Sequence, residues 1–194
     1  SSAASDVYKR QVLAHVNHHK RIQSLDEEKA MQELALNLKI PFEVLEYYYD
    51  GTDNFHNDSH HSRYEFFRKV CDKYKTDTIA TAHHQDDQIE TVLIKLMEGS
   101  NLYGYGGISI CNFDGMYRII RPLLCLDKED LYNYAKKNQL KYFEDSSNAE
   151  DDFLRNRLRH HVIPLLKKEC SDLTNKISQY SLQVKEAFQY IRSK

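Results

Sequence analysis

Three short apolar runs, each followed by a stretch with helical spacing, open the chain. The runs at residues 12–16, 42–48 and 78–82 contain many β-branched or aromatic residues, which predicts three strands. Helical spacing follows each run, at residues 24–38, at 62–74 and after residue 85. Ser24 and Glu27 have the spacing of a capping box at the first of these helices. The alternation predicts a parallel, three-layer α/β fold with right-handed crossovers.

The second half of the chain has a different pattern. Residues 111–120 look like a hairpin, and Arg121 to Leu124 should leave it in extended form because proline restricts the residue before it. Helices are expected at about 127–138 and at 173–191, the latter a connecting helix whose packing partner lies outside this chain. We therefore expect a non-native or disordered leader at 1–11, one domain at 12–168 and a connecting helix at 169–194.

Composition narrows the function only slightly. The net charge of −2 means that a nucleic acid would have to bind a local basic patch, and residues 151–168 provide one. Lys167 and Lys168 also fit a solvated helix face. Asparagine rarely stabilises the interior of a helix, so Asn156 indicates a specific contact instead. The four cysteines are scattered without a C-x-x-C pair, and no window approaches the roughly eighteen apolar residues of a membrane span. We expect reduced thiols, a cytoplasmic protein and no membrane partner.

Ionisable side chains are densest at residues 83–90, His-His-Gln-Asp-Asp-Gln-Ile-Glu. The segment follows the third predicted strand and starts a helix, where ligands of open α/β sheets bind and where N–H groups favour anions. Asp86, Asp87 and Glu90 could hold Mg²⁺ against substrate phosphates. The competing interpretation is that Asp86 and Asp87 only cap the helix. Four of the six glycines follow, at 99, 104, 106 and 107, either for close approach to a ligand or for a simple surface turn.

Taken in order, these motifs resemble the tRNA(Ile)-lysidine synthetases over about residues 12–166. The matching segments are Ala14-His15-Val16-Asn17-His18, residues 83–91, Gly99-Ser100 with Gly104, Arg121-Pro122-Leu123-Leu124, residues 144–148 and residues 155–159. The resemblance implies an N-type ATP-pyrophosphatase domain with a Rossmann-like, adenine nucleotide alpha hydrolase-like fold and a C-terminal helical extension. It implies that ATP adenylates the wobble cytidine of an isoleucine tRNA with a CAU anticodon, and that free L-lysine then displaces AMP.

The same resemblance assigns the candidate site residues. Catalytic roles fall to His83, Asp86, Asp87 and Glu90; ATP binding to Ala14, His15, Val16, Gly99, Ser100 and Gly104; phosphate or tRNA binding to Arg63, Arg121, Arg155, Asn156 and Arg159. Asp87 and Glu90 are the candidates for contact with a metal or with the ammonium group of lysine, Asp87 is the candidate Mg²⁺ ligand, and ATP and Mg²⁺ are the expected cofactors. A homodimer stays open.

Three departures from the family pattern keep alternatives open. The family's ATP loop, Ser-Gly-Gly-x-Asp-Ser, should precede residue 12 but no glycine occurs before Gly51, so the chain looks truncated. Glu98 replaces an arginine, and His60 stands where an Ala-Arg pair supplies a cation. The alternatives are another tRNA-modifying pyrophosphatase such as a thiolase, a phosphohydrolase with a metal centre, and a non-catalytic tRNA-binding fragment.

Overall fold

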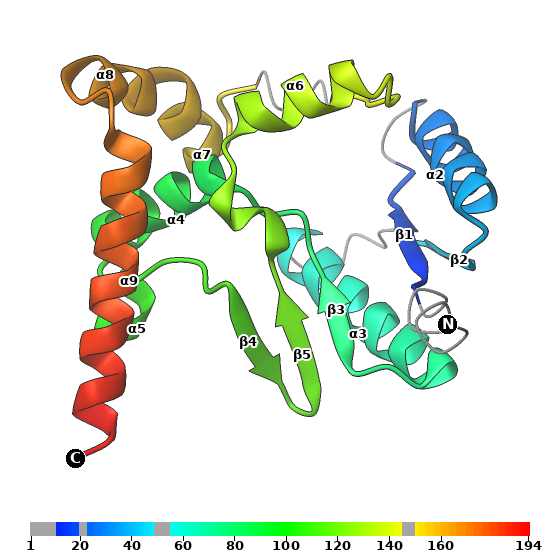
Figure 1. Ribbon diagram of the computed structural model, residues 1–194, viewed down its shortest axis with the longest axis horizontal. Helices are drawn as coiled ribbons and strands as arrows, with labels where there is room; N and C mark the ends of the chain where they lie inside the picture. Colours follow the sequence, from blue (N-terminus) through cyan, green and yellow to red (C-terminus); the bar gives the residue numbers. More distant parts are fainter. Residues whose placement is uncertain (1–10, 20–22, 49–54, 145–149) are drawn as a thin grey trace, which may run out of the picture. The chain divides into compact units, whose positions relative to one another are not determined.

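The computed structural model describes residues 11–19, 23–48, 55–144 and 150–194 (Figure 1). The chain divides into two compact units. The first comprises residues up to Ile79 together with Gly115–Arg118, and the second comprises Ala80–Asp114 and Ile119–Lys194. Apart from Gln11, the predicted leader at 1–11 lies outside the described residues, as does most of the acidic loop predicted at 144–148.

Two parallel strands and two helices make up most of the first unit. Strands β1 (Leu13–Asn17) and β2 (Phe42–Glu46) pair in parallel, with His15 opposite Val44. Helix α2 (Ser24–Leu38) connects them, and helix α3 (Phe55–Tyr74) follows β2, starting earlier than the predicted residue 62. These elements reproduce the β-α-β-α order that the apolar periodicity predicts.

The capping box predicted for α2 is wrong. The helix begins at Ser24 itself, so the residue that precedes it, Gln23, occupies the N-cap position and makes no side-chain capping bond. A capping serine has to stand outside the helix with an extended backbone. Ser24 is instead a buried residue of the first turn, so the Ser-x-x-Glu spacing falls one position too late.

The remaining strands form a second sheet in the order β3-β5-β4, and the division between the two units falls within β3 and β5. Strand β3 is Thr78–Ala80, and the predicted hairpin is confirmed as β4 (Cys111–Asp114) and β5 (Tyr117–Ile120). In the first unit Arg118 N donates to Asp77 O (2.6 Å), and in the second Thr81 N donates to Ile120 O (3.0 Å). Because the residue numbers of both strands rise together, β3 and β5 are parallel.

The rest of the second unit is helical. Its helices are α4 (Gln85–Glu98), α5 (Leu102–Tyr105), the 3₁₀ helix η2 (Pro122–Cys125), α6 (Lys128–Lys137), α7 (Leu154–Arg157), the π-helix η4 (Leu158–Val162), α8 (Ile163–Glu169) and α9 (Leu173–Arg192). The extended form predicted for residues 121–124 is therefore wrong beyond Arg121. Proline restricts the residue before it, but its own φ suits the first turn of a helix.

The core of the second unit forms around α4. Ile89 is fully buried and clusters with Leu158 and Ile163, and α9 contributes Leu173 and Ile177 to the same cluster. Helix α9 thus packs along α4 and α5, as Figure 1 shows in orange and green, which corrects the expectation that its partner lies outside the chain. None of the described helices is both long enough and apolar enough to cross a membrane.

Candidate functional site

The charged segment at residues 83–90 lies where the sequence predicts it, between the end of β3 and the first turns of α4. His84 is the N-cap residue and shares a reciprocal capping box with Asp87, whose Oδ2 accepts the His84 backbone N–H at 2.9 Å. The capping interpretation is therefore correct for Asp87. Its other oxygen, Oδ1, lies 3.8 Å from Arg155 Nη1, so capping does not use the whole carboxylate.

His83 is held beside the strand end. Its Nδ1 lies 2.9 Å from the Thr81 hydroxyl. Burial lowers the pKa of His83, and the positive charges of Arg121 and Arg155 lower it further against the opposing effect of Asp87. At neutral pH the imidazole is therefore neutral, with one nitrogen that donates and one that accepts a hydrogen bond.

Asp86 joins three helices. Its Oδ1 accepts a hydrogen bond from Lys167 Nζ of α8 (2.8 Å), and its Oδ2 accepts one from the Lys128 backbone N–H at the start of α6 (2.9 Å). Burial alone would raise the pKa of Asp86, but these two bonds lower it below its ordinary value. Lys167 therefore does not merely belong to a solvated helix face, and Asp86 has a structural partner on each oxygen.

Glu90 is the centre of a buried ion pair. Its side chain is 0% exposed, and its two oxygens accept bonds from Arg159 Nε (2.6 Å) and Nη2 (3.1 Å) in a forked arrangement. Arg155 Nη1 lies 3.6 Å from the same carboxylate, and Arg155 Nη2 donates to the Thr91 hydroxyl at 3.3 Å. Pairing with Glu90 raises the pKa of Arg159. We call Asp87, Glu90, Arg155 and Arg159 the α4 charge network.

Arg155 and Arg159, both predicted to bind phosphate or tRNA, make different contacts in the charge network. The Arg159 side chain is 26% exposed and points both arms of its fork at Glu90, whereas the Arg155 side chain is 42% exposed and makes only long contacts with the two carboxylates. Asn156, between them, is buried and donates to the Glu150 carbonyl at 2.7 Å. The specific contact that the sequence indicates for Asn156 is thus made within the protein.

The glycine segment is tied to α4 by a residue that the sequence analysis did not assign. Gln88 is buried, donates to Gly106 O (3.0 Å) and to Ser181 Oγ (2.7 Å), and accepts the Ile108 backbone N–H (2.6 Å). Gly107 has φ +62°, and a Cβ there would stand 2.9 Å from the Gln88 amide. Its glycine is required by packing against Gln88.

The predicted residues Gly99, Ser100 and Gly104 lie at the end of α4 and in α5. Gly99 ends α4 with φ +73° and has open space where a side chain would be. Asn101 caps α5 by accepting the Gly104 N–H at 2.8 Å, and a side chain on Gly104 would collide with the Ser100 hydroxyl. Both features of this segment, the turn and the close approach, have explanations within the fold. An ATP-binding role for the three residues stays a prediction.

In the first unit, predicted residues gather at the C-terminal end of β1. Arg63 Nη2 of α3 lies 3.2 Å from His18 Nε2, just beyond the strand. His15 is half-buried, its Nε2 has no hydrogen-bond partner among the described residues, and burial lowers its pKa. Asn17 is buried and donates to Glu28 of α2 at 2.7 Å. Ala14 and Val16 are neighbours of His15 in the same strand.

Arg121, the last predicted cation, is anchored to the hairpin. Its Nη1 donates to Ser109 O (2.8 Å) and to Asn112 Oδ1 (2.6 Å). Its buried Nε has no hydrogen-bond partner in the part of the chain that the structure describes. That orphaned donor is a feature for which a ligand oxygen would compensate.

The carboxylates differ in how well they fit a hard cation. Mg²⁺ usually takes one or two carboxylates along with phosphate oxygens and water. Asp86 and Glu90 have cationic or N–H partners on both oxygens, whereas Asp87 Oδ1 has only the long contact with Arg155. Of the three carboxylates proposed from the sequence, Asp87 therefore fits such an ion best.

Comparisons with known proteins show which family and which relatives the chain resembles. The sequence profile of the PP-loop domain matches residues 2–166. The tRNA(Ile)-lysidine synthase of Lactobacillus johnsonii is 37% identical over 89% of the chain, and that of Bacillus subtilis is 41% identical over 68%. The chain spans only 41% and 28% of the lengths of these two relatives.

Among solved structures, the chain is similar to the U34-tRNA thiolase NcsA from Methanococcus maripaludis with its [4Fe-4S] cluster. The TM-score is 0.71, with 18% identity over 95% of this chain and 66% of that one. This likeness shows the fold alone, and it confirms the adenine nucleotide alpha hydrolase-like arrangement of parallel strands with flanking helices.

Proposed function

The chain belongs to the PP-loop domain family, and on this premise we propose that it activates the wobble cytidine of an isoleucine tRNA with ATP for conversion to lysidine. Support comes from relatives that bear the name tRNA(Ile)-lysidine synthase and match most of the chain. Because the chain spans less than half of their length, the proposal assigns it the nucleotide-activating part of the reaction.

The proposed reaction has two steps. The C2 oxygen of the cytosine attacks the α-phosphorus of ATP, an O–P bond forms, and pyrophosphate leaves. The amine of free lysine then attacks C2, the C2–O bond breaks, AMP leaves with the former base oxygen, and the amine loses a proton. Adenylation makes a poor leaving oxygen a good one, and the step requires the phosphate charge to be neutralised. The reaction is expected in the cytoplasm, where tRNA is modified.

The observation that carries the proposal is the α4 charge network. The Arg155 side chain is 42% exposed beside two carboxylates, and its guanidinium has donor capacity left for a phosphate oxygen. Arg159 acts through Glu90 as a positioning residue that fixes the network. In this assignment Arg155 contacts ATP or tRNA phosphate, and Arg159 holds the Glu90 carboxylate that lies beside Arg155.

Two further roles follow from the neutral state of His83 and from the Asp87 oxygen that capping leaves available. A neutral His83 would hydrogen-bond the polar edge of the reacting base without adding charge. Asp87 Oδ1 would hold either Mg²⁺ or the ammonium group of lysine. When bound, Mg²⁺ supplies charge neutralisation at the phosphates.

The ATP contacts are proposed for two separate places in the chain. Strand β1, with Ala14, His15 and Val16, would contact the nucleoside, and the segment Gly99, Ser100 and Gly104 would contact phosphate. Arg63 and Arg121 would contact phosphate or tRNA with their positive charges. Arg121 would do so through its unpartnered Nε. Homodimerisation has no support from these contacts, and we do not propose it.

The test is incorporation of radiolabelled lysine into an unmodified isoleucine tRNA with a CAU anticodon, in the presence of ATP and Mg²⁺. It is run on this chain and on a version that carries a grafted Ser-Gly-Gly-x-Asp-Ser loop before β1. Arg155→Ala and Asp87→Asn are each introduced into whichever version is active. Each is expected to lower incorporation at least about tenfold, the loss that one charge-assisted contact in a transition state gives.

Glu129→Gln on α6 serves as the matched control, because it removes an exposed carboxylate that does not belong to the α4 charge network and has no assigned role, and it should leave incorporation unchanged. Full activity of Asp87→Asn would refute its assigned role. Bound tRNA without lysine incorporation in either version would instead support a non-catalytic tRNA-binding fragment, and sulfur transfer would support a thiolase.

A further inference from the structure

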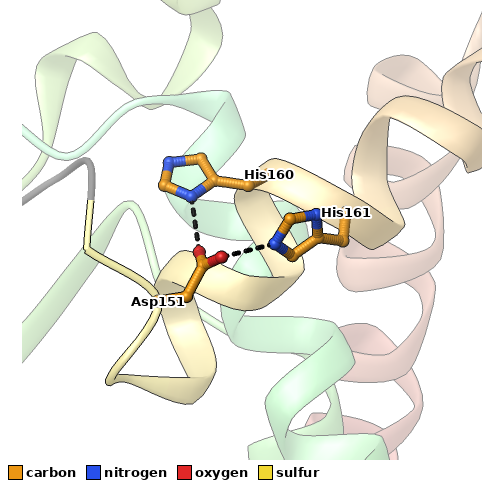
Figure 2. Close-up of side chains that lie close together, drawn as sticks. All are labelled: Asp151, His160 and His161. Atoms are coloured by element: carbon orange, nitrogen blue, oxygen red, sulfur yellow. Dashed lines mark hydrogen bonds and ion pairs between the residues drawn. The ribbon is translucent and has the colours of Figure 1, made fainter.

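Three side chains of the second unit converge away from the α4 charge network. Asp151, just before α7, lies between the imidazoles of His160 and His161, which are neighbours in the π-helix η4 (Figure 2). We propose that these three residues form a binding site for one divalent ion of the zinc class. The site is independent of the lysidine reaction proposed above, since it shares no residue with that network.

The geometry brings potential ligand atoms of all three side chains close together. Asp151 Oδ1 lies 2.8 Å from His160 Nδ1, and Asp151 Oδ2 lies 2.6 Å from His161 Nε2, as the dashed lines in Figure 2 show. All three donor atoms lie within 4.8 Å of one another. Ligand atoms around a tetrahedral zinc ion stand about 3.3 Å apart, given metal–ligand bonds of about 2.0–2.1 Å. Small side-chain rotations would therefore close the site around an ion that replaces the shared protons.

The donor set selects the class of metal. Two imidazole nitrogens and one carboxylate oxygen suit Zn²⁺ and neighbouring transition metals, whereas Mg²⁺ and Ca²⁺ prefer oxygen ligands alone. The three side chains are 46%, 30% and 63% exposed, so an ion can reach them from solvent. Three protein ligands leave a fourth position for water or an anionic group, as in open zinc sites.

The local fold holds the donors in this arrangement. Arg157 Nη1 donates to the carbonyl oxygens of both Asp151 and Asp152, each at 2.9 Å, and fixes the backbone that carries the carboxylate. Asn156 holds the preceding carbonyl, Glu150 O, at 2.7 Å. Single π-turns occur frequently at functional sites, and outer groups that orient the ligands are a regular part of metal sites.

The competing explanation is that the carboxylate only bridges two imidazoles by hydrogen bonds. The two explanations differ in whether the protein binds zinc at these residues.

Zinc titration against a chromophoric chelator distinguishes them. The wild-type chain is compared with the double variant His160→Asn/His161→Asn and with the control His60→Asn/His61→Asn, which removes two histidines from α3. We expect the wild type and the control to bind one more equivalent of Zn²⁺ than the double variant. Co²⁺ is expected to give a visible absorption spectrum of nitrogen and oxygen ligation that the double variant lacks.

Asp151→Asn provides a second variant, which keeps both imidazoles and should weaken zinc binding at least about tenfold. Circular dichroism of each variant without metal shows whether it folds, and Asp151→Asn decides the result if the double variant does not. The proposal is overturned if Asp151→Asn and the double variant bind zinc as well as the control does.

Discussion

Replacing Arg159 with alanine is expected to destabilise the second unit strongly, because it strands a buried charge. The Glu90 side chain is 0% exposed and receives two hydrogen bonds from Arg159, at 2.6 and 3.1 Å. Breaking a buried pair by removal of one partner typically costs about 3–5 kcal/mol. Arg155, 3.6 Å from the same carboxylate, partly compensates the charge, so we expect the lower end, about 3 kcal/mol.

Urea unfolding followed by circular dichroism measures this change. With a slope of about 2 kcal/mol per molar urea, the midpoint should fall by about 1.5 M. Replacing both partners, Glu90→Leu with Arg159→Met, should bring stability back to within about 1 kcal/mol of the wild type, since no charge is then stranded. Lys95→Ala, an exposed change on the same helix, should stay within about 0.5 kcal/mol.

The reasoning is refuted if Arg159→Ala costs less than about 1 kcal/mol, the range of a surface ion pair. It is also refuted if the double replacement is as unstable as the two single changes added together. Either result would mean that the loss of Arg159 does not leave the Glu90 carboxylate buried and unpaired.

Three other changes test neighbouring contacts. Asp86→Asn should lower the unfolding free energy by about 1–2 kcal/mol at pH 7. Because the pKa of Asp86 in the folded protein lies below the ordinary 3.8, the stability difference between wild type and variant should vanish as pH falls through that folded pKa. Urea unfolding curves of both proteins from pH 7 to 2 would show this. Gln88→Leu should lower the unfolding free energy by about 2–3 kcal/mol and speed amide exchange at Ile108, which hydrogen-exchange mass spectrometry measures. Unchanged exchange would contradict the role given to the hydrogen bond between Ile108 N–H and Gln88. Burial lowers the Lys185 pKa to about 8, so the folded protein binds fewer protons than the unfolded chain between pH 8 and 10.5, and wild-type stability should rise with pH there while Lys185→Met removes that contribution.

Local periodicity was sufficient to predict most of the elements. Strand β1, the hairpin and α6 all follow from spacing of apolar residues and from turn residues between them. The errors occurred where one residue decides the backbone: Gln23 rather than Ser24 occupies the N-cap position of α2, and Pro122 begins a 3₁₀ turn. The packing of α9 on α4 could not be predicted, because periodicity defines an apolar face but not what covers it.

The site was predicted as a set of residues but not as a set of pairs. Sequence order separates Glu90 from Arg159 and Asp86 from Lys167, so one-dimensional reasoning treated acids and bases as two independent features. The pairing depends on how α8 and η4 lie against α4, which is a tertiary property. The sequence shows Gln88 only as an amide within a cluster of charged residues. Its role becomes clear once the fold shows that it is buried.

The unequal burial of the charge network sets where the protein can change through evolution. Glu90 is fully enclosed and doubly bonded, so nearly every substitution there disturbs folding before it alters chemistry. The Arg155 side chain is 42% exposed and makes only long contacts with the two carboxylates, so exchanging it should cost the fold less than a change at Glu90. We therefore expect divergence of substrate preference to begin at position 155 and to leave position 90 unchanged.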